Sequence, residues 1–463
     1  MIISEELKSL AKLFKKAGEK LYIVGGYVRN ELMGVPHVLN TDIDICSAAK
    51  PEDVEKIVGK KFRAEIKDVY GNVNIYGEQK YEYTTFRKET YKVAGEHRPE
   101  SIEYVKTIEE DVKRRDFTVN SIYYDIIEDK YIDVYDGLND LENGVLKAIE
   151  TPEYVFNNDA LRILRMVRIA CSLGLDIDIK TVLYAQNNIE KLKYISKNRI
   201  REEVNKILVC DTFYPTLKYT NNAHGRAMEL LGNMGALSFI FPSLEQIRNS
   251  EIKDGGMKLY SHIMQAYYIS SPNIRLSTLF HDVGKFYSKL KYKNFWANEE
   301  YLKYYLEINL GDEKGLGYNK SHINRIFRVI TAQNFDKYLL ENRYNVRRFI
   351  VDNIDIFNEI TELMDNRKLV ETNLKKKSRV AKKLRKNYDS MVKNNVPMKL
   401  SDLDINGDDI ISNFIDIRVD KIGIILNKLF DLCLKNDNIN KKATLLVYAK
   451  KYIMKDREFY LEA

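Results

Sequence analysis

The sequence predicts an α+β protein, in which a small mixed α/β head with a β-sheet precedes a long all-α region. Three observations predict this fold class. Short apolar runs and alternating polar–apolar runs between glycine-containing turns fill the first part of the chain and are typical of strands. From Asn158 onward, apolar residues recur at three- and four-residue spacing, which is typical of helices. The length of 463 residues suits about three domains.

Composition excludes several classes of protein. The chain has 74 Lys and Arg against 67 Asp and Glu, a mild net charge of +7, and 44% hydrophobic residues, so it is neither disordered nor collagen-like. Four widely separated cysteines favour neither a disulfide framework nor a zinc site. The sequence has no secretory signal pattern and no run of 18 apolar residues. We therefore expect a cytoplasmic protein without a membrane segment.

The elements expected in the head alternate between helices and strands. Residues 1–20 form a charge-mixed amphipathic pattern that predicts a helix, and a second helix is expected from Gly26 to about Met33. Strands are expected at 21–24, 41–45, 70–76, 80–86 and 101–105, with an exposed polar loop at 88–100. The helical region is expected to break at 254–256, 311–317 and 394–397. These features divide the chain into a head (1–148), neck (149–235), body (236–365) and tail (366–463).

The segment 23–29 (IVGGYVR) is a candidate phosphate-binding turn. A buried strand leads into two glycines and a helix, and glycines allow backbone N–H groups to approach phosphate oxygens closely. Arg29, in the first turn of that helix, can contact a phosphate through two hydrogen bonds. An ordinary strand–turn–helix would have the same pattern, so this motif alone does not establish the function.

Two carboxylates lie on one face of the next strand. Period-two alternation places Asp42 and Asp44 on the same face, with Ile43 and Ile45 on the buried face. Neighbouring carboxylates are tolerated when they share divalent cations, an arrangement that can bind a triphosphate and activate a hydroxyl. Glu82, on the strand at 80–86, is a candidate third carboxylate. A solvated strand face is the alternative explanation.

Two later motifs are rich in arginine. Arg114, Arg115 and Asp116 form the first motif, in which the aspartate can orient an arginine or a sugar hydroxyl. In the second, an apolar helix has arginines at every third position, namely Arg162, Arg165 and Arg168, preceded by Asp159. Spacing of three drifts around a helix of 3.6 residues per turn, so the arginines form one broad stripe that we expect to face an anion-binding cleft. Asp159 and Arg162 are i,i+3 neighbours on that stripe. Structural salt bridges are the alternative.

Taken together, these motifs resemble the tRNA nucleotidyltransferase (CCA-adding enzyme) and bacterial poly(A) polymerase family, within the polymerase-β-like nucleotidyltransferases. The resemblance covers residues 21–210 and includes the segment 83–87 (YTTFR) and the loop containing 97–99 (HRP). It implies a nucleotidyltransferase head and a two-metal transfer that adds CCA to tRNA 3′ ends from CTP and ATP, releasing pyrophosphate. It implies the following roles: Asp42 and Asp44 bind catalytic Mg²⁺; Gly26 and Arg29 hold the triphosphate; Arg115, Arg165 and Arg168 bind the nucleotide; Asp159 and Arg162 read the base; the loop 87–100 helps switch between CTP and ATP.

The chain departs from this family at three places. Asn30 replaces an aspartate, Asn158 replaces the glutamate before Asp159, and about three additional residues lie at 38–40. The segment 279–285 (LFHDVGK) resembles the core of HD-type phosphohydrolases, and His262 could be a second metal ligand. Because further ligands are missing, we expect a vestigial helical body that does not hydrolyse phosphoesters.

Residues 367–386 contain ten Lys or Arg and one Glu, and we expect them to contact tRNA phosphates, with a solvated helix face as the alternative. Several alternatives to CCA addition stay open. A-adding and poly(A) polymerases share the head motifs, whereas the loop 87–99 argues against an enzyme that adds only CC. Outside the family, the alternatives are an RNA-binding protein with an inactive head and an HD phosphohydrolase. The sequence leaves the oligomeric state open.

Overall fold

The structure, a computed structural model, describes residues 1, 3–39, 42–68, 70–91, 99–294, 298–335, 340–414 and 417–455. The chain forms two compact units. Unit 1 contains residues Met1–Ser250 and Tyr304–Asn319, and unit 2 contains Glu251–Lys303 and Lys320–Ala463. An α/β sheet opens unit 1 and helices dominate the rest, so the predicted α+β class is confirmed. The finer division into head, neck, body and tail stays a prediction.

The head is built on a seven-stranded mixed sheet with the order β3-β4-β5-β2-β1-β8-β9. Strands β2 and β5 run parallel, and the other neighbours are antiparallel. The sheet contains β1 (Tyr22–Val24), β2 (Asp44–Ser47), β3 (Arg63–Ile66), β4 (Asn72–Tyr76), β5 (Lys80–Thr85), β8 (Tyr123–Asp125) and β9 (Lys130–Ile132). The β2–β5 register places Asp44 opposite Glu82, which brings two predicted site residues together.

The expected loop at 88–100 is wrong at its start. β6 (Arg87–Thr90) pairs antiparallel with β7 (Ser101–Tyr104) and forms a two-stranded ribbon. The polar composition of this segment hid the strand, because a two-stranded ribbon with exposed faces does not require apolar alternation. Residues 92–98, which include His97 and Arg98 of the predicted loop, lie outside the described residues.

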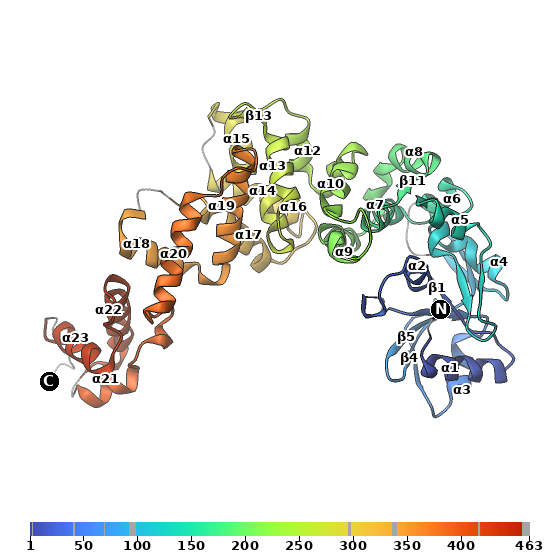
Figure 1. The fold of residues 1–463 in the computed structure, drawn as a ribbon, viewed down its shortest axis with the longest axis horizontal. Helices are drawn as coiled ribbons and strands as arrows, with labels where there is room; N and C mark the ends of the chain where they lie inside the picture. Colours follow the sequence, from blue (N-terminus) through green and yellow to red (C-terminus); the bar gives the residue numbers. More distant parts are fainter. Residues whose placement is uncertain are drawn as a thin grey trace. The chain divides into compact units, whose positions relative to one another are not determined.

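Two helices pack on the head sheet, α1 (Glu5–Lys16) and α3 (Pro51–Val58), and they lie side by side below β4 and β5 (Figure 1). The Ser4 hydroxyl caps α1 by accepting a hydrogen bond from the Leu7 N–H, at 3.1 Å. Acidic residues in its first turn and lysines in its last turn complement the helix dipole. The apolar faces of both helices join the strands in one core, which includes Phe14, Val54 and Tyr83. Two further helices of the head are α4 (Ile108–Asp111) and α5 (Gly137–Glu142), followed by the short strand β10 (Val145–Leu146).

After the head, unit 1 continues as a series of helices. The continuous helix expected from Asn158 is wrong at its start, because α6 ends at Asn158 and Asp159 has extended backbone (φ −155°, ψ 105°). Asp159 therefore lies in a break between two helices rather than on the arginine stripe. The elements of this region are α6 (Pro152–Asn158), α7 (Leu161–Leu173), β11 (Asp176–Ile177), α8 (Ile179–Asn187), α9 (Lys197–Leu208), α10 (Ala223–Asn233), α11 (Leu237–Ile240) and α12 (Pro242–Arg248).

Unit 2 is helical apart from a small hairpin, β12 (Lys253–Asp254) with β13 (Met257–Lys258), whose turn contains the predicted break at 254–256. Its helices include α13 (Leu259–Tyr268), α14 (Arg275–Phe280), α15 (Val283–Tyr292), α17 (Lys320–Ala332), α18 (Arg343–Asp352), α19 (Phe357–Glu371), α20 (Arg379–Lys393), α21 (Gly407–Asn413), α22 (Ile422–Lys435) and α23 (Lys442–Lys455), while α16 (Glu299–Leu310) spans the boundary with unit 1. One apolar core runs through α18 to α23. Across the described ranges, each helix is too short or too polar to span a bilayer.

Candidate active site

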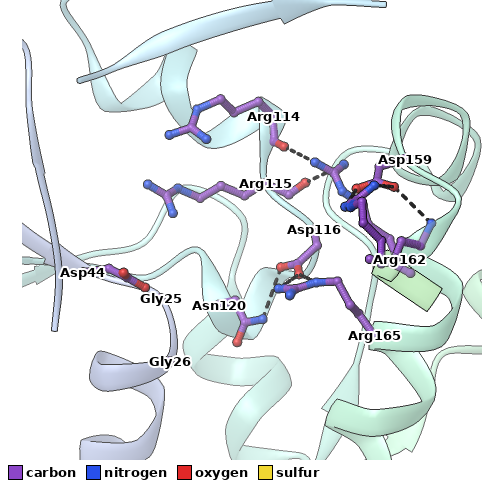
Figure 2. A pocket seen from close by; sticks show the side chains of 12 residues that line it. Gly25, Gly26, Asp44, Arg114, Arg115, Asp116, Asn120, Asp159, Arg162 and Arg165 are labelled. Carbon is purple, nitrogen blue, oxygen red and sulfur yellow. Dashed lines mark hydrogen bonds and ion pairs between the residues drawn. The ribbon is translucent and has the colours of Figure 1, made fainter. Parts of the chain in front are cut away.

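A cavity of about 320 Å³ in unit 1 lies between the start of strand β2 in the head sheet and the start of α7. Figure 2 shows Gly25, Gly26 and Asp44 on one side and Asp159, Arg162 and Arg165 on the other. Among described residues, five arginines and three aspartates line the cavity, so its walls carry excess positive charge. The lining residues are Gly25, Gly26, Asp44, Arg114, Arg115, Asp116, Asn120, Asp159, Leu161, Arg162, Arg165 and Arg199. Such a cavity suits a polyanion.

The turn between β1 and α2 (Gly26–Leu32) forms one wall. Gly25 caps α2 with a φ of 85°, a conformation that favours glycine. A Cβ atom at this position would lie 3.2 Å from the Asp44 Oδ2 atom. Glycine therefore keeps open the space beside the carboxylate.

Arg29 lies behind this wall, where it is 5% exposed. Its guanidinium donates hydrogen bonds to the side-chain oxygens of Asn120, at 2.5 Å, and Asn30, at 2.6 Å. A third contact, at 3.2 Å, reaches the hydroxyl of Tyr214. Asn120 lines the cavity and Arg29 does not. In this conformation Arg29 is therefore connected to the cavity by its hydrogen bond to the neutral side chain of Asn120. Asn30, where the family has an acid, accepts from Arg29 without neutralising it.

The predicted carboxylates lie just before and at the start of β2, the central strand of the sheet. Ile43 and Ile45 are buried at 7% and 0% exposure, so the predicted alternation is confirmed, although β2 begins only at Asp44. Part of the Asp44 side chain is open to the cavity. Desolvation by the surrounding protein, together with repulsion from Glu82 and Asp42, outweighs Arg115 and raises the pKa of Asp44 to about 6. Neither Asp42 nor Asp44 forms an ion pair with any residue the structure describes.

Glu82 is a third acidic group beside Asp42 and Asp44, but its carboxylate already pairs with the Lys80 ammonium. Its Oε1 atom accepts a hydrogen bond from the Lys80 ammonium, at 2.6 Å, and this contact lowers the pKa of Glu82. Because Glu82 lies opposite Asp44 in the β2–β5 register, it adds negative charge beside the pair.

Arg114 and Arg115 are held by Asp111, a residue that the sequence analysis missed. Asp111 is completely buried and accepts hydrogen bonds from Arg114, at 2.8 Å, and Arg115, at 3.0 Å. The Tyr123 hydroxyl adds a third, at 2.7 Å, and the Arg115 guanidinium lies 5.0 Å from the Tyr123 ring centre. Burial opposes ionisation of Asp111, but the two guanidiniums outweigh it and hold its pKa well below the usual range. Asp111 thus fixes two cavity arginines.

Asp116 orients an arginine of α7 rather than its sequence neighbours. Its Oδ2 atom accepts two hydrogen bonds from Arg165, at 2.7 and 3.1 Å. Its Oδ1 atom accepts one from the Asn120 amide, at 3.1 Å. Although burial favours the neutral acid, Arg165 and Arg162 lower the pKa of Asp116 to about 2.

The two residues expected to read the base both line the cavity, but they do not pair with each other. Asp159 pairs with Arg199 of α9, at 3.0 Å. Arg162 donates to the backbone carbonyls of Arg114, at 2.6 Å, and Val155, at 3.3 Å. Arg168, expected on the same stripe, lies outside the cavity lining and pairs with Glu203, at 2.5 Å.

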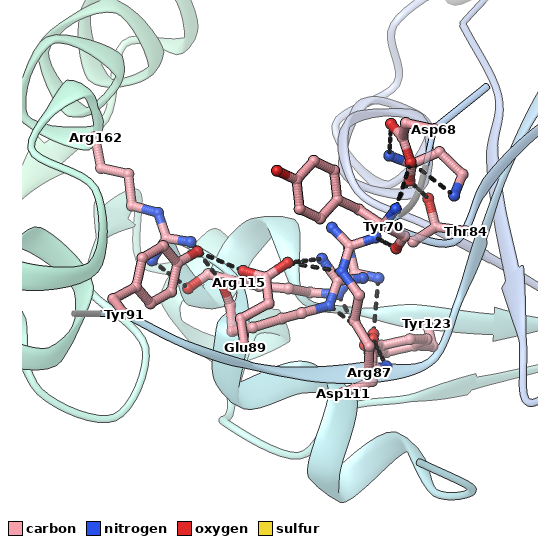
Figure 3. Close-up of polar contacts among 12 residues, drawn as sticks. Asp68, Tyr70, Thr84, Arg87, Glu89, Tyr91, Asp111, Arg115, Tyr123 and Arg162 are labelled. Carbon is pink, nitrogen blue, oxygen red and sulfur yellow. Dashed lines mark hydrogen bonds and ion pairs between the residues drawn. The ribbon is translucent and has the colours of Figure 1, made fainter. Parts of the chain in front are cut away.

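The base of the predicted switching loop contacts the cavity walls. Glu89 of β6 accepts hydrogen bonds from Arg87, at 2.7 Å, and Tyr91, at 2.5 Å, and it lies 3.8 Å from Arg114. Figure 3 shows Tyr91 and Glu89 between Arg162 and Arg87. A chain of polar contacts thus connects the start of the loop to a cavity arginine.

A second titratable cluster lies in unit 2. His262 and His281 approach Asp282 at 3.1 and 3.2 Å, and the ligand atoms of all three lie within 4.8 Å of one another. The Lys285 ammonium is 2.9 Å from the other Asp282 oxygen. Burial raises the pKa of Asp282, but His281, Lys285 and the hydrogen bond from His262 outweigh burial and hold this pKa well below its usual range. The carboxylate is therefore already compensated by side chains, and a divalent cation there would face an adjacent ammonium.

The sequence analysis missed Asp111, Asn120 and Arg199. Asn120 follows the Arg-Arg-Asp motif, and its spacing of four from Asp116 is the available signal. Asp111 stands in an acidic run with no distinguishing pattern, and Arg199 is separated by forty residues from the aspartate that it contacts. Their roles depend on packing between distant segments.

Comparison with known proteins agrees with the resemblance predicted from the sequence. Residues 21–147 match the family described as the poly A polymerase head domain, and residues 174–219 match the probable RNA and SrmB-binding site of polymerase A. A CCA-adding enzyme of Ligilactobacillus salivarius is 38% identical over 213 residues, 45% of this chain and 50% of the relative. One from Streptococcus suis is 35% identical over 246 residues, 52% of this chain and 59% of the relative. The chain spans about half the length of the curated relatives it matches.

Solved structures extend the similarity in fold along the chain. The CCA-adding enzyme of Bacillus stearothermophilus in complex with CTP has a TM-score of 0.61 at 20% identity, covering 98% of this chain and 99% of that one. The Thermotoga maritima CCA-adding enzyme complexed with tRNA has a TM-score of 0.55 at 18% identity, covering 97% and 96%. The predicted resemblance to the tRNA nucleotidyltransferase and poly(A) polymerase family is confirmed, and residues 21–147 match the poly A polymerase head domain.

Proposed function

We propose that this chain is a template-independent nucleotidyltransferase that adds CCA to tRNA 3′ ends from CTP and ATP. One observation carries the proposal: Asp44, a carboxylate at the start of β2, lines an arginine-rich cavity that Asp159 and Arg162 also line. The arginines can bind the phosphates of a nucleotide, and the carboxylate can bind the metal ion that assists its transfer. The relatives named CCA-adding enzymes support the same substrates.

We assign Mg²⁺ to Asp42 and Asp44, because the donor set fits this ion. Carboxylate oxygens are the ligands that Mg²⁺ prefers, and Gly25 leaves space beside the Asp44 Oδ2 atom. Bound there, the ion would supply positive charge to the triphosphate and to the attacking 3′-hydroxyl. The chain itself holds the nucleotide for in-line attack, so its contribution is mainly positioning and electrostatics.

The phosphate side of the cavity combines several predicted residues. Gly26 contributes backbone to the wall, and Arg115 and Arg165 point guanidiniums toward it from two different segments (Figure 2). Arg29 and Arg168 are buried or paired beside the cavity, so their proposed phosphate and nucleotide contacts need a side-chain rearrangement or act through neighbours.

The base-reading side consists of Asp159 and Arg162. A carboxylate accepts hydrogen bonds from the exocyclic amine that C and A share, while a guanidinium donates to a ring acceptor. G and U do not present this combination. Both side chains line the same cavity, which supports their assignment as a protein template.

We propose that tRNA also contacts the tail, in the basic segment 367–386. Its exposed lysines include Lys375, Lys376 and Lys377 before α20, and Lys382 and Lys383 on its first turns. Among described residues, no ion pair involves these five lysines. The four-part domain division and a cytoplasmic location belong to the same proposal.

One assay tests the function and its nearest alternatives. Purified protein is incubated with tRNA lacking its terminal CCA and labelled CTP or ATP, singly and together. CCA addition requires two C residues and then one A; an A-adding enzyme extends only tRNA that already ends in CC, and a poly(A) polymerase adds long A tracts. Poly(A) activity is kept as a second candidate because the head matches a poly A polymerase family. No incorporation with any nucleotide would refute the proposal.

A further inference from the structure

Arg199 connects the base-reading aspartate to a second helix. Its Nη2 atom lies 3.0 Å from the Asp159 Oδ2 atom, and its Nη1 atom lies 3.4 Å from Oδ1. Oδ1 also accepts the Leu161 N–H, at 3.0 Å. Asp159 is 6% exposed, whereas the Arg199 side chain is 25% exposed and lines the cavity. The guanidinium therefore supports a mostly buried carboxylate from the open side.

This contact places a positive charge directly beside the carboxylate of Asp159. An ionised carboxylate only accepts, whereas a protonated carboxyl group also donates. Burial alone favours the protonated form, and a nearby cation favours the ionised one. Arg162, which also lines the cavity, donates hydrogen bonds to backbone carbonyls, and Arg165 forms an ion pair with Asp116. Among the described arginines that line the cavity, Arg199 is the one whose guanidinium contacts the Asp159 carboxylate.

The hydrogen-bonding state of Asp159 matters for base selection. An acceptor at this position fits the exocyclic amine of C or A. A donor would instead fit the carbonyl oxygen that U and G present at the corresponding position. With an ionised Asp159, U or G would place a carbonyl oxygen against a carboxylate oxygen, and neither acceptor would have a donor. A protonated Asp159 could donate to that carbonyl, so binding of U and G would no longer be penalised.

We propose that Arg199 is a positioning residue that keeps Asp159 ionised and aimed into the cavity, and so excludes UTP and GTP. This inference rests on the proposed function and adds a specificity determinant to it. Residue 158, beside the aspartate, is an uncharged Asn in this chain, so this sequence neighbour brings no second carboxylate to share the guanidinium.

The test measures equilibrium binding of CTP, ATP, UTP and GTP to the full chain in Mg²⁺, followed by single-nucleotide extension of tRNA. Arg199→Gln and Arg199→Met both remove the charge and keep an unbranched side chain. If Arg199→Gln does not fold, Arg199→Met replaces it, because an apolar side chain is tolerated at this partly buried position. Lys206→Gln, an exposed lysine on the same helix, is the matched control. Arg199→Lys keeps the charge. Thermal unfolding confirms that each variant is folded.

We expect both neutral variants to lose preference for CTP over UTP by about tenfold, the value of one base contact. Arg199→Lys should recover most of that preference, and Lys206→Gln should keep all of it. In an Asp159→Asn background, Arg199→Gln should change selectivity no further, because Arg199 acts through the charge of that carboxylate. Neutral variants as selective as the parent would overturn this inference and leave the proposed function standing. A parent protein that binds neither CTP nor ATP would overturn both.

Discussion

The carboxylate of Asp116 accepts two hydrogen bonds from the guanidinium of Arg165, at 2.7 and 3.1 Å. These residues come from the Arg-Arg-Asp motif of the head and from α7. The ion pair joins the two walls of the cavity. The Asp116 carboxylate also accepts a hydrogen bond from the side-chain amide of Asn120, whose oxygen accepts one from Arg29. A single carboxylate therefore couples the phosphate side of the cavity to the helix that begins beside the base-reading residues.

Asp116→Asn should lower stability in a pH-dependent way. The pKa of Asp116 is lowered from an ordinary value of 3.8 to about 2, so its ionised form stabilises the fold above pH 4 and loses this effect as the pH falls toward 2. Lowering the pKa from 3.8 to about 2 corresponds to roughly 2 to 3 kcal/mol of stability. The difference in unfolding free energy between the parent and the variant should be constant from about pH 8 to pH 5 and shrink below about pH 4. A difference that does not change with pH would contradict this account.

Asp44→Asn should abolish nucleotide addition without unfolding the protein. The substitution removes one of the closely spaced carboxylates, so the metal-free protein should be at least as stable as the parent. Mg²⁺ should raise the melting temperature of the parent protein but not of this variant. Glu52→Gln, which changes an exposed carboxylate on α3, provides the control. Mg²⁺-dependent stabilisation that survives in Asp42→Asn/Asp44→Asn would place the ion elsewhere.

Glu89→Gln should affect AMP addition more than CMP addition. The carboxylate holds Arg87 and Tyr91 at the base of the loop expected to switch between the two nucleotides. A neutral amide weakens these charge-assisted hydrogen bonds by about 1 kcal/mol, or roughly fivefold in rate if the switch depends on them. Glu103→Gln, exposed on the adjacent strand β7, should leave the ratio unchanged. Equal losses for both nucleotides would argue for a purely structural role.

Replacing Lys375, Lys376 and Lys377 together with Glu should weaken tRNA binding across different tRNAs. Each lost phosphate contact lowers the salt dependence of binding, so the slope of log K against log salt should become shallower by about one per contact. Lys12, Lys15 and Lys16 on α1, changed in the same way, control for net charge. Unchanged affinity at low salt would show that the segment is a solvated helix face.

The cluster around Asp282 should not hydrolyse phosphoesters. Lys285 already compensates its carboxylate, and further ligands of an HD site are missing from the sequence. Protein supplied with nickel or manganese should release no product from 2′,3′-cyclic phosphates, while nucleotide addition in the same sample shows that the protein is folded. Sustained turnover that depends on His262 would refute the prediction of a vestigial body.

Local sequence patterns determined much of the head. The alternation of Asp42 and Asp44 with buried isoleucines follows from strand geometry, and Gly25 follows from a turn that requires positive φ. These features depend on neighbours within a few residues, so they can be read directly from the chain. The same holds for the helical character of residues after Glu150, which arises from local apolar spacing.

Only the tertiary structure decided which charges meet. Asp116 could pair with Arg115 or with an arginine of α7, and Asp159 with Arg162 or Arg199; in each case the distant partner forms the contact. The break after Asn158 turns Asp159 away from the arginine stripe and toward α9. Side chains of opposite charge attract at any sequence separation, so spacing alone cannot rank their partners. Packing of α9 against α7, and of α7 against β10, sets the distances, and the distances select the pairs.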